Sequence, residues 1–381
     1  MSRAGHPILA VMRCIIGNVN ETMNWKRYLT YWMCGGLVTV SPFLLQGCSQ
    51  DAAPSEQQGM SMQLSGVTRA GNSETGTEPV TDAHIRVFLA NGNAVTEGLF
   101  TYNNQGGWNS TVKVIAGTTY HVYGYMPSDI ADSHSVTSNG TVATMTLTGM
   151  KAVSDQDVCV LVGIQRVTSP TAEKNVVEGN YTYEAGEEGT NYAYVLMDHL
   201  YASLKASFSV NADYDALRQI YLKEVTFISG YNKVNAVITF TDDTDGSGLT
   251  NVTMNKVTPA TEGTKGSATT TLPNSDSGKM GTKLPIENSG TYDVLFYFAP
   301  TIFDSVDDAM IVKSTYDVYD RKGNLVRSDC TAENKLVFSA KFGSDVIIAR
   351  GLQYQLKMTV TPTYLYMLSD PDLDNPTVSV E

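Results

Sequence analysis

The sequence lacks the residue patterns that mark common enzyme active sites. It contains no Gly-x-Ser-x-Gly nucleophile elbow, no Gly-rich phosphate-binding loop and no His-Glu-x-x-His zinc motif. Histidine, the most frequent general base, occurs only five times in 381 residues. Two of these, His84 and His121, lie in predicted strands beside ordinary neighbours. We therefore expect neither a catalytic site nor a bound cofactor.

Charge is also scarce, and positive charge most of all. Charged residues make up 17% of the chain, and its net charge is −13. Residues 1–47 hold four basic residues and one acid, so the rest of the chain is more acidic than the whole. Because an acidic surface repels phosphate backbones, the composition argues against nucleic acid as a partner.

Cysteine is too sparse for a disulfide framework or a zinc cluster. Cys159 and Cys330 lie in different predicted domains, and Cys159 falls in an apolar strand, where a free thiol behaves as a small hydrophobe. Neither has a second Cys or a His at ligand spacing, so we expect no disulfide and no metal site. Residues 242–246 resemble half of a calcium loop, but Val252 lies where the closing acid is needed, which favours a hairpin turn.

One apolar run near the start of the chain carries the strongest local signal. The basic pair Lys26-Arg27 precedes residues 28–45, which are apolar, and Gly47-Cys48 follows. A basic region, an apolar region and a small residue before a cleavage point are typical of a secretory signal. The end of this run is similar to a lipobox, which predicts a leader at 1–47 and a lipid on Cys48. A transmembrane anchor is the alternative, although the run is short for one.

A polar tether and a short strand are predicted after the lipid site. Residues 49–59 are polar and low in apolar content, as expected of a flexible tether. Residues 59–68 then alternate, and Met60, Met62, Leu64 and Gly66 share one face. We assign 48–69 to the tether and this first strand. Met23, just before the basic pair, is an alternative start of the chain.

Alternation of apolar and polar residues recurs through the rest of the chain and is typical of half-buried strands. It predicts strands at 84–89, 118–125, 141–147, 158–164, 203–210, 222–228, 236–240, 291–298, 314–319, 336–342 and 354–360. The only predicted helix is a short turn at 214–219, capped by Asp213. Many short strands separated by turn residues predict an all-β protein of two tandem β-sandwich domains, at 70–200 and 201–361.

The order of these features resembles a known family. A lipobox is followed by a short tether, a lone Arg and two all-β domains, and the segments that carry the likeness are 67–71, 85–89, 116–125, 351–358 and 362–376. Together they resemble the fimbrillins, the lipoprotein pilins of type V fimbriae. The resemblance covers most of the chain after Cys48, as pattern and order, and no single segment is specific to that family.

The resemblance implies transthyretin-like β-sandwich domains and a role as a structural or adhesive subunit of a fimbria. In that family an Arg-specific protease removes the first strand, and the exposed groove accepts a strand from a neighbouring subunit. Arg69, followed by Ala70, matches the cleavage position and is the only Lys or Arg between Cys48 and Arg86. The implied partners are other fimbrial subunits, the outer membrane through the lipid on Cys48, and a host or bacterial surface ligand. The implied location is the outer-membrane surface and the fimbrium.

The tail, residues 362–381, extends past the last predicted strand and is a candidate donor strand. Tyr364, Tyr366 and Leu368 share one face, and the pattern resumes after a Pro-containing linker at Val378 and Val380. The alternative is that this tail completes the second domain of its own chain.

A surface lipoprotein that binds glycans for a nutrient-uptake system is the alternative function. Such a protein would also be acidic, lipidated and all-β, but it should present several exposed aromatic residues in its loops. After Cys48 the chain has a single tryptophan, Trp108, and most tyrosines lie at alternating strand positions. The sequence therefore favours the fimbrial subunit.

Overall fold

The computed structural model describes residues 59–69, 84–103, 105, 107–242, 249–257, 265–300, 310–336, 349–364 and 371–380. The chain divides into one unit over Met1–Ser55 and a second over Glu56–Glu381, and every described residue belongs to the second unit. The predicted leader and Cys48 lie outside the described residues.

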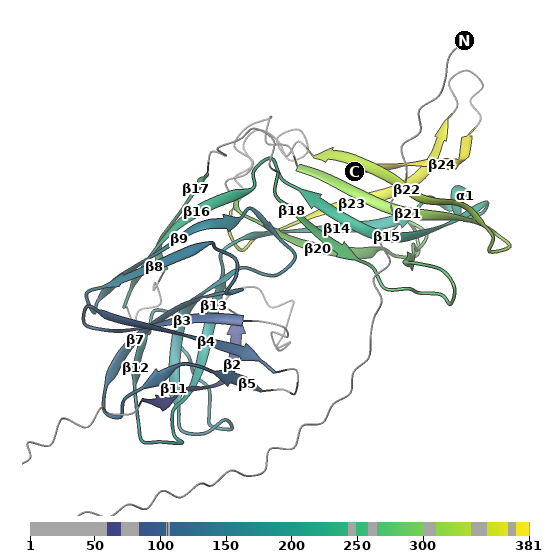
Figure 1. The fold of residues 1–381 in the computed structure, drawn as a ribbon. Coiled ribbons are helices and arrows are strands. Elements are labelled where there is room, and N and C mark those ends of the chain that lie inside the picture. The colour runs from purple at the N-terminus through teal and green to yellow at the C-terminus, as the bar shows by residue number, and fades with distance from the viewer. Residues whose placement is uncertain are drawn as a thin grey trace, which may run out of the picture. The chain divides into compact units, whose positions relative to one another are not determined.

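The first sandwich consists of an eight-stranded and a four-stranded sheet (Figure 1). The larger sheet has the order β2 (Gln63–Arg69), β13 (Tyr192–His199), β11 (Cys159–Val167), β7 (Thr119–Met126), β3 (His84–Asn91), β4 (Ala94–Tyr102) and β5 (Trp108–Ser110), and β12 (Thr182–Glu184) also pairs with β7. The smaller sheet has the order β17 (Leu249–Lys256), β16 (Lys233–Thr241), β9 (Val142–Lys151) and β8 (Ser133–Ser138). The rings of Tyr123 in β7 and Phe240 in β16 lie 5.1 Å apart, so the inner faces of the two sheets pack together.

The second sandwich consists of two further sheets. One has the order β10 (Val153–Ser154), β20 (Tyr292–Phe298), β14 (Ala202–Val210), β23 (Gln353–Tyr364) and β24 (Pro371–Val380). The other has the order β18 (Ser267–Thr271), β15 (Arg218–Ile228), β21 (Met310–Asp320) and β22 (Leu325–Leu336), with β19 (Thr282–Lys283) beside β15. Phe227 of β15 stacks on Phe296 of β20 with ring centroids 5.1 Å apart, which joins the two layers.

Burial follows the alternation that the sequence predicts. In β16, Val234, Ala236, Ile238 and Phe240 are fully buried, and the residues between them face outward or are only partly covered. This is the period of two that places successive side chains on opposite faces of a strand. The prediction of an all-β protein built from sandwiches is confirmed.

The only helix among the described residues is shorter and earlier than predicted. The sequence predicts a turn at 214–219 with Asp213 as its cap, whereas α1 spans Ala212–Asp215 with Asn211 as its N-cap. The Asn211 carboxamide oxygen accepts hydrogen bonds from the backbone N–H groups of Asp213 and Tyr214. Residues from Arg218 onward belong instead to β15, where Arg218 lies opposite Asp320 and Leu222 opposite Tyr316 in β21.

Two strand pairs join residues from both sides of the predicted domain boundary at residue 200. β9 pairs with β16, where Ala143 lies opposite Phe240, and β10 pairs with β20, where Val153 lies opposite Phe298. The described chain therefore crosses between the sandwiches at five points, between β9 and β10, β10 and β11, β13 and β14, β15 and β16, and β17 and β18. The ranges 70–200 and 201–361 stay predictions. Of the predicted strand at 336–342, only Leu336 lies among the described residues, as the end of β22.

Candidate functional site

The strand β2 lies at one edge of the eight-stranded sheet and pairs only with β13 (Figure 1). The pairing is parallel, with Gln63 opposite Tyr192 and Arg69 opposite Met197. Just before β2, β1 (Met60–Ser61) pairs with β6 (Lys113–Val114). An edge strand can leave a sheet by breaking one ladder of hydrogen bonds, whereas a central strand must break two. β2 is therefore placed where removal disturbs the sheet least.

Although β2 lies at an edge, its inward side chains belong to the core. Leu64 of β2 is 6% exposed, and Met62, which lies between β1 and β2, is fully buried. The Met62 N–H donates to the Val112 carbonyl at 3.0 Å, and the Gln63 N–H donates to the Asn191 carbonyl at 2.7 Å. Burying a Met or Leu side chain contributes about 1.5–3 kcal/mol. The strand fills a preformed apolar groove, and its loss would expose that groove to water.

A glycine in β2 lets a large side chain of β13 lie close against the strand. A Cβ added at Gly66 would come within 2.9 Å of Tyr194 Cε2, a separation that a real side chain could not keep. The Lys174 ammonium lies 4.8 Å from the centre of the same tyrosine ring, so the ring is held between a cation and the strand. Tyr194 is only partly buried, so a side chain at position 66 would have to displace its ring or the Lys174 ammonium.

The predicted cleavage site lies at the end of this strand. Arg69 is the last residue of β2, and Ala70 lies outside the described residues. Cleavage between them would separate the whole of β1 and β2 from the rest of the chain, and cleavage a few residues earlier would leave part of the strand in place. The sequence predicted this strand at 59–68, directly before Arg69, and the structure extends the strand by that one residue.

The C-terminal strand, β24, occupies the edge of the five-stranded sheet. It pairs antiparallel with β23, with Val378 opposite Val360 and Val380 opposite Met358. Val378 is 7% exposed and Val380 is partly buried. In this structure the end of the tail therefore completes a sheet of its own chain. This is the arrangement expected if the tail belongs to the second domain of its own chain.

The other tail residues named from the sequence are described less fully. Tyr364 ends β23, where its backbone pairs with Pro371, whereas Tyr366 and Leu368 lie outside the described residues. The Tyr316 hydroxyl of β21 donates to the Pro376 carbonyl of β24 at 3.0 Å. Burial raises the pKa of Tyr316 to about 12, so the hydroxyl keeps the proton that it donates at neutral pH. This bond fastens β24 to the second layer of its sandwich.

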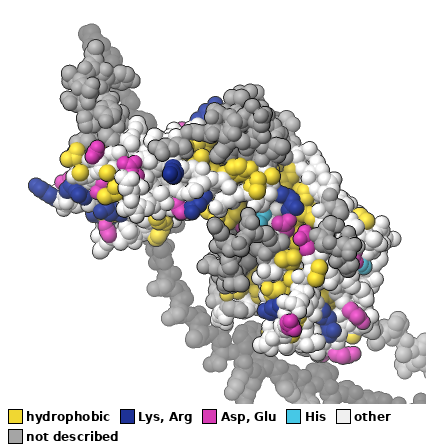
Figure 2. Space-filling view, turned by 180° about the vertical axis from the view of Figure 1, so that it is seen from behind, with side chains coloured by type: hydrophobic (Ala, Val, Ile, Leu, Met, Phe, Trp, Pro, Cys, Tyr) yellow, Lys and Arg dark blue, Asp and Glu magenta, His cyan; other side chains and the backbone are white. Residues whose placement is uncertain are grey.

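Neither candidate strand carries charge in the part that enters the sandwich. Residues 60–68 and 376–380 contain no Asp, Glu, Lys or Arg, in a chain whose net charge is −13. A strand of this kind can enter an apolar groove without the cost of removing water from a charged group. On the face shown in Figure 2, acidic and basic side chains are interspersed and separated by uncharged surface.

Two other groups of residues from the sequence analysis have structural partners. His121 contacts Asp242 at 3.1 Å, and Asp242 also accepts a hydrogen bond from Thr182 at 3.1 Å. The rest of the half-calcium loop, 243–248, lies outside the described residues. Trp108 is partly buried against the core, and its ring and that of Tyr102 form a T-shaped pair with centroids 5.4 Å apart. Cys159 and Cys330 are both buried free thiols.

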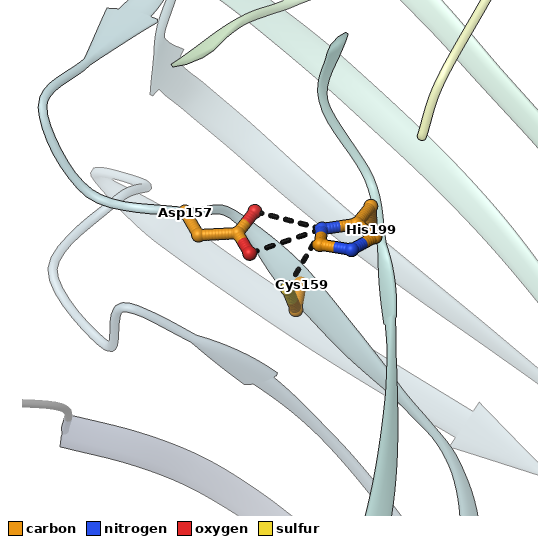
Figure 3. Close-up of side chains that lie close together, drawn as sticks. All are labelled: Asp157, Cys159 and His199. Carbon is orange, nitrogen blue, oxygen red and sulfur yellow. Dashed lines mark hydrogen bonds and ion pairs between the residues drawn. The ribbon is translucent and has the colours of Figure 1, made fainter. Parts of the chain in front are cut away.

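One cluster of metal-ligating side chains was missed by the sequence analysis. Asp157, just before β11, Cys159 at its start and His199 at the end of β13 converge on one point (Figure 3). Asp157 and Cys159 are two residues apart and share a face, and the antiparallel register places Cys159 opposite His199. The Asp-x-Cys spacing was visible in the sequence, but the histidine lies forty residues away, and only the register brings it near.

No protein-family model matches the chain, and no curated protein matches it. Among solved structures, a fimbrial protein from Bacteroides vulgatus ATCC 8482 aligns over 84% of this chain and 98% of its own, with 12% identity and a TM-score of 0.37. A candidate cell adhesion protein from Bacteroides fragilis NCTC 9343 aligns over 85% and 97%, with 9% identity and a TM-score of 0.40. At these identities and TM-scores the likeness transfers no function to this chain. Among the described residues, no helix is long and apolar enough to cross a membrane.

Proposed function

We propose that this protein is a structural or adhesive subunit of a bacterial surface fimbria. In this proposal it is exported as a lipoprotein through Cys48, cleaved between Arg69 and Ala70, and assembled by strand exchange at the outer-membrane surface. The observation that carries the proposal is the position of β2, an edge strand that follows the buried Met62, buries Leu64, and carries no charged residue except Arg69 at its end.

Loss of β2 would create an acceptor site for another strand. The β13 backbone from Tyr192 to Met197 would lose its partner, and the pockets filled by Met62 and Leu64 would open. Unpaired strand edges and open apolar grooves bind an incoming strand, which supplies backbone hydrogen bonds along its length and side chains at alternate positions. A neighbouring fimbrial subunit is the partner that this geometry suits.

The C-terminal strand β24 is the donor in this proposal. Val378 and Val380 alternate at strand spacing and could fill two successive pockets, as Met62 and Leu64 do. Before exchange the strand rests at the edge of its own sheet, where it protects the same apolar side chains from water. Exchange then replaces the ladder between β23 and β24 with a ladder of similar length between two subunits. Burial of the apolar groove that cleavage opens supplies the driving force.

The proposal is tested by limited trypsin digestion of the full chain purified from membranes. We expect a new N-terminus at Ala70, followed by ladders of subunits that survive mild heating in detergent. Arg69→Ala should leave a folded protein that forms no ladder. Lys322→Ala, which removes an exposed basic residue from a turn far from β2 in the sequence, is the matched control and should form ladders normally. Ladder formation by Arg69→Ala would overturn the assigned cleavage step.

A further inference from the structure

A buried cluster far in sequence from the two exchange strands has the composition of a metal site. We infer that Asp157, Cys159 and His199 bind one divalent transition-metal ion of the class of Zn²⁺. One ligand atom from each residue lies within 4.8 Å of the other two. His199 Nδ1 is 3.0 Å from an oxygen of Asp157 and 3.8 Å from the sulfur of Cys159 (Figure 3).

These separations are close to those around a tetrahedral ion. With Zn–S of about 2.3 Å and Zn–N or Zn–O of about 2.0–2.1 Å, neighbouring ligand atoms lie about 3.3–3.6 Å apart. The nitrogen–oxygen and nitrogen–sulfur distances differ from this range by only a few tenths of an ångström. The oxygen and the sulfur lie within 4.8 Å of each other, so closing all three groups around one ion requires these two atoms to approach.

The contacts of the His199 ring differ from those in a catalytic triad. In a Cys–His–Asp triad the acid contacts one ring nitrogen and the nucleophile contacts the other. Here both Asp157 and Cys159 approach the same nitrogen, Nδ1. An ion at the point of convergence contacts all three ligand atoms together.

Charge and ligand type select the class of ion. Cys159 is fully buried and the Asp157 side chain is 4% exposed. A thiolate and a carboxylate together carry two negative charges, and a divalent cation neutralises both in a site where unpaired charge is costly. Sulfur and imidazole nitrogen favour zinc and its neighbours over calcium or magnesium, which prefer oxygen. The His199 side chain is 24% exposed, which leaves a direction for a water molecule as fourth ligand.

The cluster lies where the chain crosses between the sandwiches. Asp157 belongs to the connection from β10 to β11, and His199 immediately precedes the connection from β13 to β14. These connections are already joined by a hydrogen bond from the Leu200 N–H to the Val158 carbonyl at 2.7 Å. Arg350 adds a third segment by donating to the His199 carbonyl at 3.1 Å. An ion held here would tie two crossing segments together, which is a structural role.

The experiment is a cobalt(II) titration of the metal-free full chain. Cobalt(II) takes tetrahedral zinc sites, and a bound thiolate gives an intense near-ultraviolet charge-transfer band. We expect saturation at one ion per chain, loss of the band on addition of zinc(II), and release of protons on binding. Cys159→Ser should lose the band, and Cys330→Ser, which removes the other buried free thiol, should retain it. His199→Asn provides a second test at a partly exposed position if the serine variant does not fold.

Zinc should also raise thermal stability. At a free concentration one hundred times its dissociation constant, the ion shifts the folding equilibrium about 100-fold in the wild type, and it should leave His199→Asn unchanged. Absence of the band in the folded wild type, or its survival in Cys159→Ser, would overturn the inference. The metal site and the fimbrial proposal can fail separately. Ladder formation by His199→Asn after trypsin treatment tests strand exchange, and the cobalt(II) band tests metal binding.

Discussion

Truncation of Met62 should weaken the hold of the first strand on the protein and speed assembly after cleavage. Met62 is fully buried although it lies beside an edge strand, and its backbone N–H is bonded to the Val112 carbonyl. Replacing a buried Met with Ala costs about 3 kcal/mol of unfolding free energy. In a sandwich of about 150 residues this lowers the Tm of the uncleaved protein by about 6–12 °C.

The same loss acts on the fragment that remains after trypsin cuts at Arg69. A fragment held less tightly by about 3 kcal/mol is retained about 100-fold more weakly, so the groove becomes free sooner. Met62→Ala should therefore form ladders faster than the wild type. The assay follows the ladder bands against time in detergent gels run without boiling, with trypsin stopped by an inhibitor at a fixed time.

A matched control separates weakening of the strand from general destabilisation. Val87 of β3 is also fully buried, but it belongs to a central strand that cleavage does not remove. Val87→Ala should lower the Tm without speeding ladder formation. If Met62→Ala lowers the Tm and the ladders form at the wild-type rate, release of β2 is not the step that opens the groove, and the reasoning fails.

Three further perturbations test other parts of the proposal. Cys48→Ala should move the protein from the membrane fraction to the soluble fraction, measured by immunoblotting, because a lipid on that residue is its proposed anchor. Deleting residues 371–381 removes one well-buried valine. The deletion should lower the Tm by less than about 10 °C and abolish ladders. A larger fall in the Tm would assign β24 to its own domain. Tyr316→Phe removes the hydrogen bond to Pro376, worth about 1 kcal/mol, and should quicken the appearance of ladders, whereas slower assembly would argue against β24 as the donor.

Local patterns in the sequence predicted strands well because burial in a sheet alternates from residue to residue. The first strand was predicted at 59–68 with Met60, Met62, Leu64 and Gly66 on one face. The structure divides this segment into β1 and β2 and buries Met62 and Leu64, whereas Met60 and Gly66 are only partly buried. The same reasoning located β16 from its alternating apolar residues. In these segments the information lies within a few neighbouring positions, and the physical rule of two residues per repeat is sufficient.

Pairing between distant segments was not predictable in the same way. The hairpin of β16 and β17 follows the predicted boundary at residue 200, yet β16 pairs with β9. Nothing in the alternation of β16 distinguishes one apolar partner sheet from another. The cluster of Asp157, Cys159 and His199 has the same origin, because it exists only through the register between β11 and β13. Register depends on contacts made throughout a sheet, and a single sequence does not contain it in readable form.

Both candidate exchange strands lie at sheet edges, from which a strand can leave with little disruption of the fold. β2 and β24 lie at sheet edges and near opposite ends of the described chain, so each can leave without threading a loop or breaking more than one ladder. Withdrawal of β7, by contrast, would break its pairing with both β3 and β11. Loss of the segment before Arg69 therefore changes one edge of the eight-stranded sheet and removes β1 from β6, and it takes no central strand from either sandwich. A fold that must lose one strand and accept another can remain folded throughout only if the exchanged strands occupy such positions.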